Sequence, residues 1–149
     1  MRLRVIWVGK TKDARLRALC EDYLTRLSHF VRCEITELRD SKAEGIERES
    51  KRISDALHEG TVIVLLDPAG RQWTSAELAK QVQRWNNQGT REVSFVIGGP
   101  QGLGPALVAA ADKRWSLSQL TLTHEMARVL LLEQLYRAYT IINNLPYQK

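Results

Sequence analysis

The stretch SFVIGGPQGLGP, residues 94–105, decides the fold class. Its apolar residues Phe95, Val96 and Ile97 stop at two glycines and a proline, and two more glycines follow. An apolar run that ends at turn residues is typical of a strand buried on both faces of a parallel sheet. Glycine lets another group come close to the main chain. The loop is therefore either a tight turn without a ligand or a close approach to another chain segment, a phosphate or a different ligand.

Strands and helices are predicted to alternate along the rest of the chain. Hydrophobic periodicity indicates strands at residues 2–8, 31–38, 61–66, 92–97 and 114–118. It indicates helices at about 13–28, from Ser41 to Gly60, from Thr74 to Gly89, at 105–113 and at 125–142. Ser41 with Glu44, and Thr74 with Glu77, match a capping box, and residues 67–70 have the chemistry of a turn. This order predicts a single α/β domain over residues 1–149, with helices flanking a mostly parallel sheet.

Composition excludes several classes of protein. The 149 residues are 44% hydrophobic, enough for a core without disulfides or metal. Two cysteines make neither a disulfide framework nor a zinc site, and no apolar run approaches the roughly 20 residues of a membrane span. We therefore expect a soluble cytoplasmic protein with no metal and no membrane partner. The net charge of +5 mildly favours a polyanionic partner.

Common catalytic motifs are absent. No lysine follows the glycine loop before Lys113, so the loop is not a Walker A motif, and its glycine spacing does not match the dinucleotide fingerprint. His124-Glu125 is not a zinc-protease motif, because Arg128 stands where the second histidine belongs, and no G-x-S-x-G elbow occurs. Taken alone, His124 is more typical of a capping or packed histidine than of a catalyst, and Asp67 of a residue that caps its own turn.

Parallel sheets bind ligands beyond the carboxyl ends of their strands. Three segments leave such ends, at 66–70, 98–104 and 119–123, and we expect them to form the walls of one site. The last predicted helix is apolar around its whole circumference and therefore needs cover on more than one side. Either an intramolecular sandwich or a second subunit would provide that cover, and we favour a dimer. Arg128 and Arg137 would then lie at the interface or reach into the site.

Several segments resemble one known family. LLDPAGRQW, FVIGGPQGLGP, WSLSQLTLTHEMARVLLLEQLYRAY and the final NNLPYQK are similar to the RlmH family of ribosomal RNA methyltransferases, and the likeness runs nearly end to end. The resemblance implies a SPOUT-type α/β fold with a C-terminal trefoil knot, and a homodimer that binds S-adenosyl-L-methionine in the knot. It also implies methylation of N3 of a pseudouridine in 23S rRNA of the assembled ribosome.

The resemblance also implies site residues. The positions expected to bind the cofactor are Leu66, Gly99, Gln119, Leu120, Thr121, Leu122, Thr123 and His124. Adenosine would slide between main-chain segments, and a side chain at Gly98 or Gly99 would fill that space. We hypothesise that Arg128, Arg137 and Tyr147 approach the acceptor base, with His124 a weaker candidate. The tail that carries Tyr147 would fold over the site, from its own or the partner subunit.

This sequence departs from the family pattern in its tail. Gln148 follows Tyr147, and Leu145 stands in the tail, at positions where many relatives have histidine. The main alternative is therefore a ribosome-associated SPOUT-fold factor that is catalytically weak or inactive. A Rossmann-like nucleotide-binding enzyme is a second alternative, disfavoured by the missing glycine fingerprints. Thr123 replaces a common proline, but threonine can cap the helix that follows.

Overall fold

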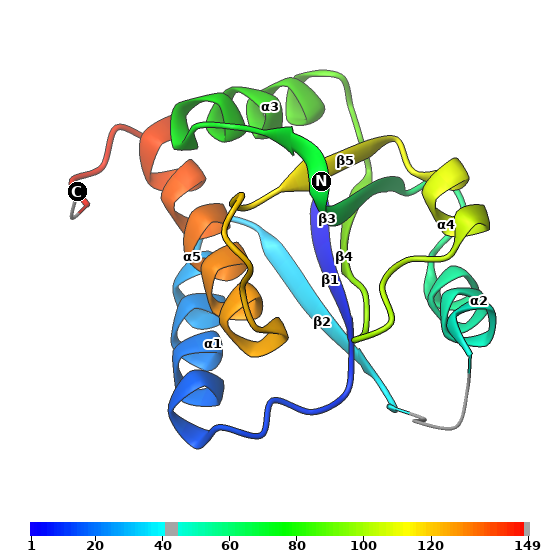
Figure 1. The fold of residues 1–149 in the computed structure, drawn as a ribbon. Helices are drawn as coiled ribbons and strands as arrows, with labels where there is room; N and C mark the ends of the chain where they lie inside the picture. Colours follow the sequence, from blue (N-terminus) through cyan, green and yellow to red (C-terminus); the bar gives the residue numbers. More distant parts are fainter. Residues whose placement is uncertain (41–44, 148–149) are drawn as a thin grey trace.

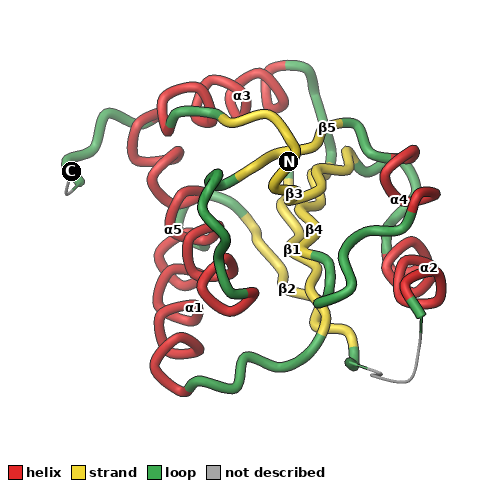
Figure 2. Tube along the Cα trace, viewed as in Figure 1, coloured by secondary structure: helices red, strands yellow, loops and turns green. Residues whose placement is uncertain are grey.

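The computed structural model describes residues 1–40 and 45–147, with strands and helices alternating as predicted. Figures 1 and 2 show a central sheet with helices on both sides. In chain order the elements are β1 (Arg2–Val8), α1 (Ala14–Leu27), β2 (Arg32–Leu38), α2 (Ile46–Ala56), β3 (Val62–Gln72), α3 (Ser75–Asn87), β4 (Glu92–Ile97), α4 (Pro105–Ala110), β5 (Lys113–Ser116) and α5 (His124–Ile142).

The five strands form one sheet in the order β2-β1-β4-β3-β5, and every neighbouring pair is parallel. The predicted α/β class with a parallel sheet is therefore confirmed. From β1 the chain moves across the sheet toward one edge to form β2. From β4 it moves toward the opposite edge to form β5. Such a divergence opens a crevice at the carboxyl ends of the strands, where ligands bind in open α/β sheets.

Both faces of the sheet are buried because its strands are apolar at consecutive positions. Trp7 and Val64 belong to the larger core cluster, whereas their neighbours Val8 and Leu65 belong to a smaller cluster on the opposite face. Helices α1, α3 and α5 cover the first face, and α2 with α4 cover the second (Figure 1). The continuous apolar runs in the sequence thus have their expected cause.

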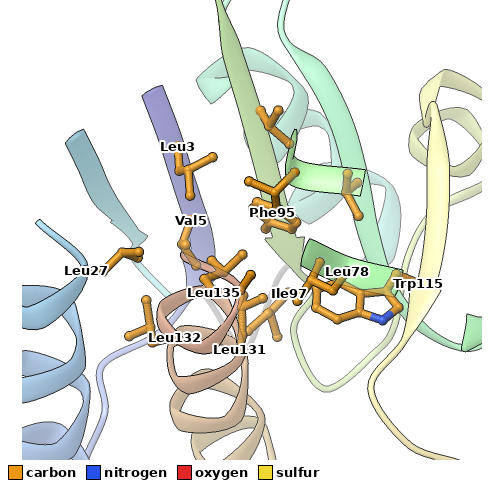
Figure 3. Close-up of a cluster of buried hydrophobic side chains, with 14 of the residues drawn as sticks. Leu3, Val5, Leu27, Leu78, Phe95, Ile97, Trp115, Leu131, Leu132 and Leu135 are labelled. Atoms are coloured by element: carbon orange, nitrogen blue, oxygen red, sulfur yellow. The ribbon is translucent and has the colours of Figure 1, made fainter. Parts of the chain in front are cut away.

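Helix α5 lies between α1 and α3, against the sheet. Figure 3 shows Leu131, Leu132 and Leu135 of α5 in the core, and each is fully buried. Met126 and Ile141 keep 41% of their surface exposed. Much of the apolar circumference of α5 is therefore covered within a single chain, as in the intramolecular alternative. The homodimer stays a prediction, and so does the trefoil knot.

The sequence predicted that the strand ends at a turn at residues 67–70, and this prediction is wrong. β3 continues to Gln72, with a register shift between Leu66 and Arg71 against β5. Within the bulge, Asp67 Oδ1 accepts a hydrogen bond from the Ala69 N–H at 2.9 Å, so the turn chemistry bends the strand without ending it. A Cβ on Gly70 would lie 2.6 Å from the main chain of Arg114, so only glycine lets the two strands come this close.

Other boundaries differ by a few residues. β5 ends at Ser116, before the predicted end at 118, because the Ser118 hydroxyl accepts from the Leu120 N–H and turns the chain. α4 ends at Ala110 instead of 113, since β5 begins at Lys113. The capping box at Thr74 is confirmed by a 3.1 Å hydrogen bond from the Glu77 N–H to its hydroxyl. The one predicted at Ser41 and Glu44 lies outside the described residues.

Candidate functional site

A cavity of about 460 Å³ lies at the carboxyl ends of β3, β4 and β5. The three segments expected to form the walls of one site line it together. Its lining comprises Leu66, Asp67, Pro68, Ile97, Gly98, Gly99, Pro100, Gly102, Leu103, Val108, Arg114, Ser116, Leu117, Ser118, Leu120, Thr121, Leu122, His124 and Ala127. Most of this lining is apolar side chain or glycine backbone.

Six of the eight positions expected to bind a cofactor belong to this lining; they are Leu66, Gly99, Leu120, Thr121, Leu122 and His124. Gln119 and Thr123 do not line the cavity. The Thr123 hydroxyl instead accepts from the Met126 N–H at 3.2 Å and caps α5, as the sequence predicted. The structure therefore brings together most of the predicted set, although its members come from three separate segments spread along the chain from Leu66 to His124.

The glycine loop is held from behind by α2. The N–H of Gly99 donates to Glu49 Oε1 at 3.0 Å, and the N–H of Gly104 donates to the Ser50 hydroxyl at 2.8 Å. Glu49 is 7% exposed and Ser50 is 5% exposed. A Cβ on Gly99 would lie 2.5 Å from Glu49 Oε2, a distance that atoms do not tolerate. At this position glycine makes room for a carboxylate of the same chain.

This finding changes the reason for the glycine. Sequence reasoning assigned the space beside Gly99 to adenosine. Glu49 instead faces inward, three residues after Ile46 and four before Ile53. That spacing places it on the apolar stripe of the helix, so the signal was available in the sequence.

One ion pair closes the cavity wall near β5. Arg114 Nε donates to Asp67 Oδ2 at 2.9 Å. Burial raises the pKa of Asp67, but hydrogen bonds from the Ala69 N–H and Arg114 outweigh it and lower the pKa overall. Asp67 thus caps its own turn, as expected, and also neutralises Arg114. The cavity therefore suits a ligand that is mainly apolar, with a few polar groups.

A second cavity, of about 570 Å³, adjoins the first and shares Pro100 and His124 with it. It lies at the carboxyl ends of β1 and β2, and its lining comprises Val8, Gly9, Lys10, Lys12, Glu37, Leu38, Arg39, Asp40, Pro100, His124, Glu125 and Arg128. The two cavities flank the point where the chains leaving β1 and β4 diverge, which is where a parallel sheet is expected to bind ligands.

Arg128 forms part of the wall of the second cavity and is only 3% exposed. Its guanidinium donates to the Val8 carbonyl at 2.8 Å and to the Thr11 hydroxyl at 2.9 Å, and lies 4.8 Å from the centre of the Trp7 ring. Burial lowers the pKa of Arg128 from its usual value. These contacts fix a cation at the edge of the cavity.

A family model described as "Predicted SPOUT methyltransferase" matches residues 1–148. The chain belongs to the SPOUT methyltransferase family. Three similar proteins carry the name "Ribosomal RNA large subunit methyltransferase H". Those from Geotalea daltonii and Geobacter sp. strain M21 are 43% and 44% identical, over 99% of this chain and 99% and 98% of their own length. The one from Desulfotalea psychrophila is 41% identical over 100% of both chains.

The predicted catalytic residues of this SPOUT methyltransferase do not gather within one chain. Arg137 and Arg128 are nine residues apart on α5, or about 13.5 Å along the helix. Arg137 pairs with Glu133 at 2.9 Å, and Tyr147 donates to the same carboxylate at 2.9 Å. Burial, together with hydrogen bonding to Tyr23 and Glu133, raises the pKa of Tyr147.

The tail therefore contacts the C-terminal half of α5 through Tyr147, while His124, at the N-terminal end of the helix, lines both cavities. That Arg128, Arg137 and Tyr147 approach one acceptor stays a prediction; within one chain the rise of the helix places Arg128 well apart from the other two.

In residues 1–40 and 45–147, no group of three or more histidine, cysteine and acidic side chains is placed to hold a metal. No helix in the same ranges is both long and apolar enough to cross a membrane.

Proposed function

We propose that this chain transfers a methyl group from S-adenosyl-L-methionine to N3 of a pseudouridine in 23S rRNA of the assembled ribosome, in the cytoplasm. The observation that carries the proposal is the cavity at the carboxyl ends of β3, β4 and β5, built by the segments around Leu66, Gly99 and Leu120–Leu122. Because the chain belongs to the SPOUT methyltransferase family, we assign methyl transfer to this cavity. Relatives named for large-subunit ribosomal RNA give the proposal its substrate.

The residues present fit this cofactor. The volume of about 460 Å³ lies within the 300–1,000 Å³ of typical ligand sites. Leu66, Leu120 and Leu122 offer apolar surface for an adenine ring, and the backbone of the glycine loop offers hydrogen-bonding groups beside it. S-adenosyl-L-methionine supplies a methyl group that its sulfonium has already activated. The protein then has to position the acceptor nitrogen in line with that group.

We place the acceptor nucleotide in the second cavity. It adjoins the first at His124, and its rim carries Lys10, Lys12 and Arg39, which suit a phosphate. Pseudouridine N3 must lose a proton before or during the transfer. The fixed guanidinium of Arg128 would stabilise the negative charge that develops on the base. Of the three main predicted catalytic residues, Arg128 lies at this cavity, together with the weaker candidate His124.

Arg137 and Tyr147 would act across a homodimer. Each tail lies too far along α5 to cover its own cavity, so the tail over a given site would come from the partner subunit. A complementation experiment tests this. One variant, Leu66→Arg, blocks the cofactor cavity, and another ends after Asn144 and lacks the tail.

Neither variant alone should methylate ribosomes, but a refolded mixture should regain about a quarter of wild-type activity. Half of randomly paired dimers are mixed, and each mixed dimer has one complete site. If circular dichroism shows that both variants fold normally and the mixture is still as inactive as either variant alone, the shared site is contradicted. Full activity of the truncated chain would show that the tail has no role.

The function itself is tested with labelled S-adenosyl-L-methionine and intact ribosomes purified from cells that lack the modification. Nucleoside mass spectrometry should find N3-methylpseudouridine in 23S rRNA, and free rRNA should be a poor substrate because the ribosomal surface supplies specificity. Ribosome binding without any methylated product would favour the alternative of an inactive SPOUT-fold factor.

A further inference from the structure

A third hollow lies beside β5, on the opposite side of the cofactor cavity from the acceptor cavity. We call it the β5-edge groove. Its volume is about 380 Å³, and its lining comprises Arg71, Trp73, Glu77, Lys80, Gln81, Arg84, Lys113 and Arg114. These residues come from the end of β3, the start of β5, one face of α3 and the residue that joins β3 to α3. Arg114 also lines the cofactor cavity, so the two hollows are adjacent.

The groove concentrates positive charge. Five of its residues are basic and one is acidic, a net +4, whereas the whole chain carries +5. Arg114 is paired with Asp67. Within residues 1–40 and 45–147, no carboxylate lies at ion-pair distance from any of the other four cations, which are Arg71, Lys80, Arg84 and Lys113.

Two of these cations lie close together on α3, an arrangement that by itself destabilises the helix. Lys80 and Arg84 are four residues apart on α3 and therefore face the same side. Like charges at this spacing destabilise a helix. An anion bound in the groove would attract both cations, so the pair would then stabilise the bound state.

An uncharged residue points to the same kind of ligand. Gln81 lines the groove and is only 8% exposed, yet its side-chain amide makes no hydrogen bond to any other residue of the described ranges. The amide atoms still reach solvent, so they are available to a ligand that has both donor and acceptor groups. Ribose hydroxyls and phosphate oxygens supply both. Trp73, held against Trp115 at a ring separation of 5.2 Å, adds a rigid aromatic wall.

We propose that the β5-edge groove binds the ribose–phosphate backbone of the rRNA substrate, an inference that rests on the proposed function. The groove and the acceptor cavity lie on either side of the cofactor cavity, near β5 and near β1 with β2. Three strand spacings separate β1 from β5, which is about 14 Å. A folded RNA strand that places one nucleotide in the acceptor cavity would be held at a second point by the groove. Phosphate contacts of this kind fix the register of a substrate without reading its sequence.

The main test uses the double variant Lys80→Gln/Arg84→Gln with intact ribosomes as the probe. The matched control is Arg32→Gln/Arg91→Gln, which removes two exposed cations from the amino ends of β2, at the opposite edge of the sheet, and of the central strand β4. The groove variant should raise the KM for ribosomes roughly tenfold. It should also reduce the slope of log binding constant against log salt concentration by about one to two. The control should change neither quantity. Calorimetry should give both variants the wild-type affinity for S-adenosyl-L-methionine.

A second variant separates hydrogen bonding from charge. Gln81→Leu keeps the size of the side chain and removes the amide, so ribosome affinity should fall several-fold while the salt slope stays unchanged. To identify the partner, a photoreactive p-benzoylphenylalanine replaces Glu77 at the rim of the groove. Crosslinking to 23S rRNA supports the proposal, and crosslinking only to a ribosomal protein overturns it.

Failure of this inference can be told apart from failure of the proposed function. If the wild-type chain methylates ribosomes and the groove variant keeps the wild-type KM and salt slope, the groove does not bind RNA. If the wild-type chain forms no methylated nucleoside, the proposed function itself fails.

Discussion

Replacing Gly99 with alanine should destabilise the protein through Glu49, a residue 50 positions away in the sequence. The added Cβ would lie 2.5 Å from Glu49 Oε2 and 2.6 Å from Oε1, so the carboxylate must move. Overpacking of this kind costs about 1–3 kcal/mol. The shift also breaks the 3.0 Å hydrogen bond from the Gly99 N–H, which to a charged acceptor contributes about 1.5–3 kcal/mol. Gly99 does not have a positive φ, so alanine recovers about 0.4–1 kcal/mol of chain entropy.

The expected net loss is about 2–4 kcal/mol in the free energy of unfolding, measured by urea denaturation. For a chain of this size it lowers Tm by roughly 5–15 °C. The same displacement moves the wall of the cofactor cavity, so affinity for S-adenosyl-L-methionine should also fall. Gly99→Val, with a larger side chain, should abolish cofactor binding.

A double-mutant cycle with Glu49→Ala decides whether this reasoning is correct. Without the Glu49 side chain there is nothing for the new Cβ to meet, so Gly99→Ala should then cost less than about 1 kcal/mol, a coupling energy of about 2 kcal/mol. Gly45→Ala is the control, because no atom lies within 4 Å of the Cβ that it adds. An equal cost of Gly99→Ala in both backgrounds would refute the steric argument.

Three further predictions concern other parts of the chain. Arg128→Lys should lower the free energy of unfolding by about 1–3 kcal/mol in urea denaturation, because lysine cannot reproduce both hydrogen bonds of the buried guanidinium. Burial raises the pKa of Glu92, but hydrogen bonds from His58 and other neighbours outweigh it and lower the pKa below its ordinary 4.5. The contribution of ionised Glu92 to the free energy of unfolding is therefore present above pH 4.5 and is lost as the pH falls through the pKa of the folded state. In Glu92→Gln, the free energy of unfolding measured by urea denaturation should fall less steeply on the acid side than in the wild type. Burial raises the pKa of Cys33 to about 12, so iodoacetamide at pH 8 should alkylate this thiol only in denaturant, as mass spectrometry of the intact chain would show.

The sequence by itself determined the order and type of the elements. Continuous apolar runs such as residues 62–66 predicted strands buried on both faces, and alternation with amphipathic helices predicted the parallel sheet. Both are local patterns that burial enforces at each position. The position of the candidate cavity followed from the same reasoning, because in a parallel sheet all strand ends meet at one edge.

Tertiary structure alone decided which groups meet across the chain. The turn residues at 67–70 became a bulge because pairing with β5 resumes at Arg71, and nothing local to that turn specifies its partner strand. Arg137 and Tyr147 were separated from Arg128 by the length of α5 and by a tail that folds back onto Glu133. The partners of the glycine loop and the charge of the β5-edge groove also depend on chain segments brought together by folding. Such contacts are set by the packing of distant elements, whose free energy has no counterpart in any short window of sequence.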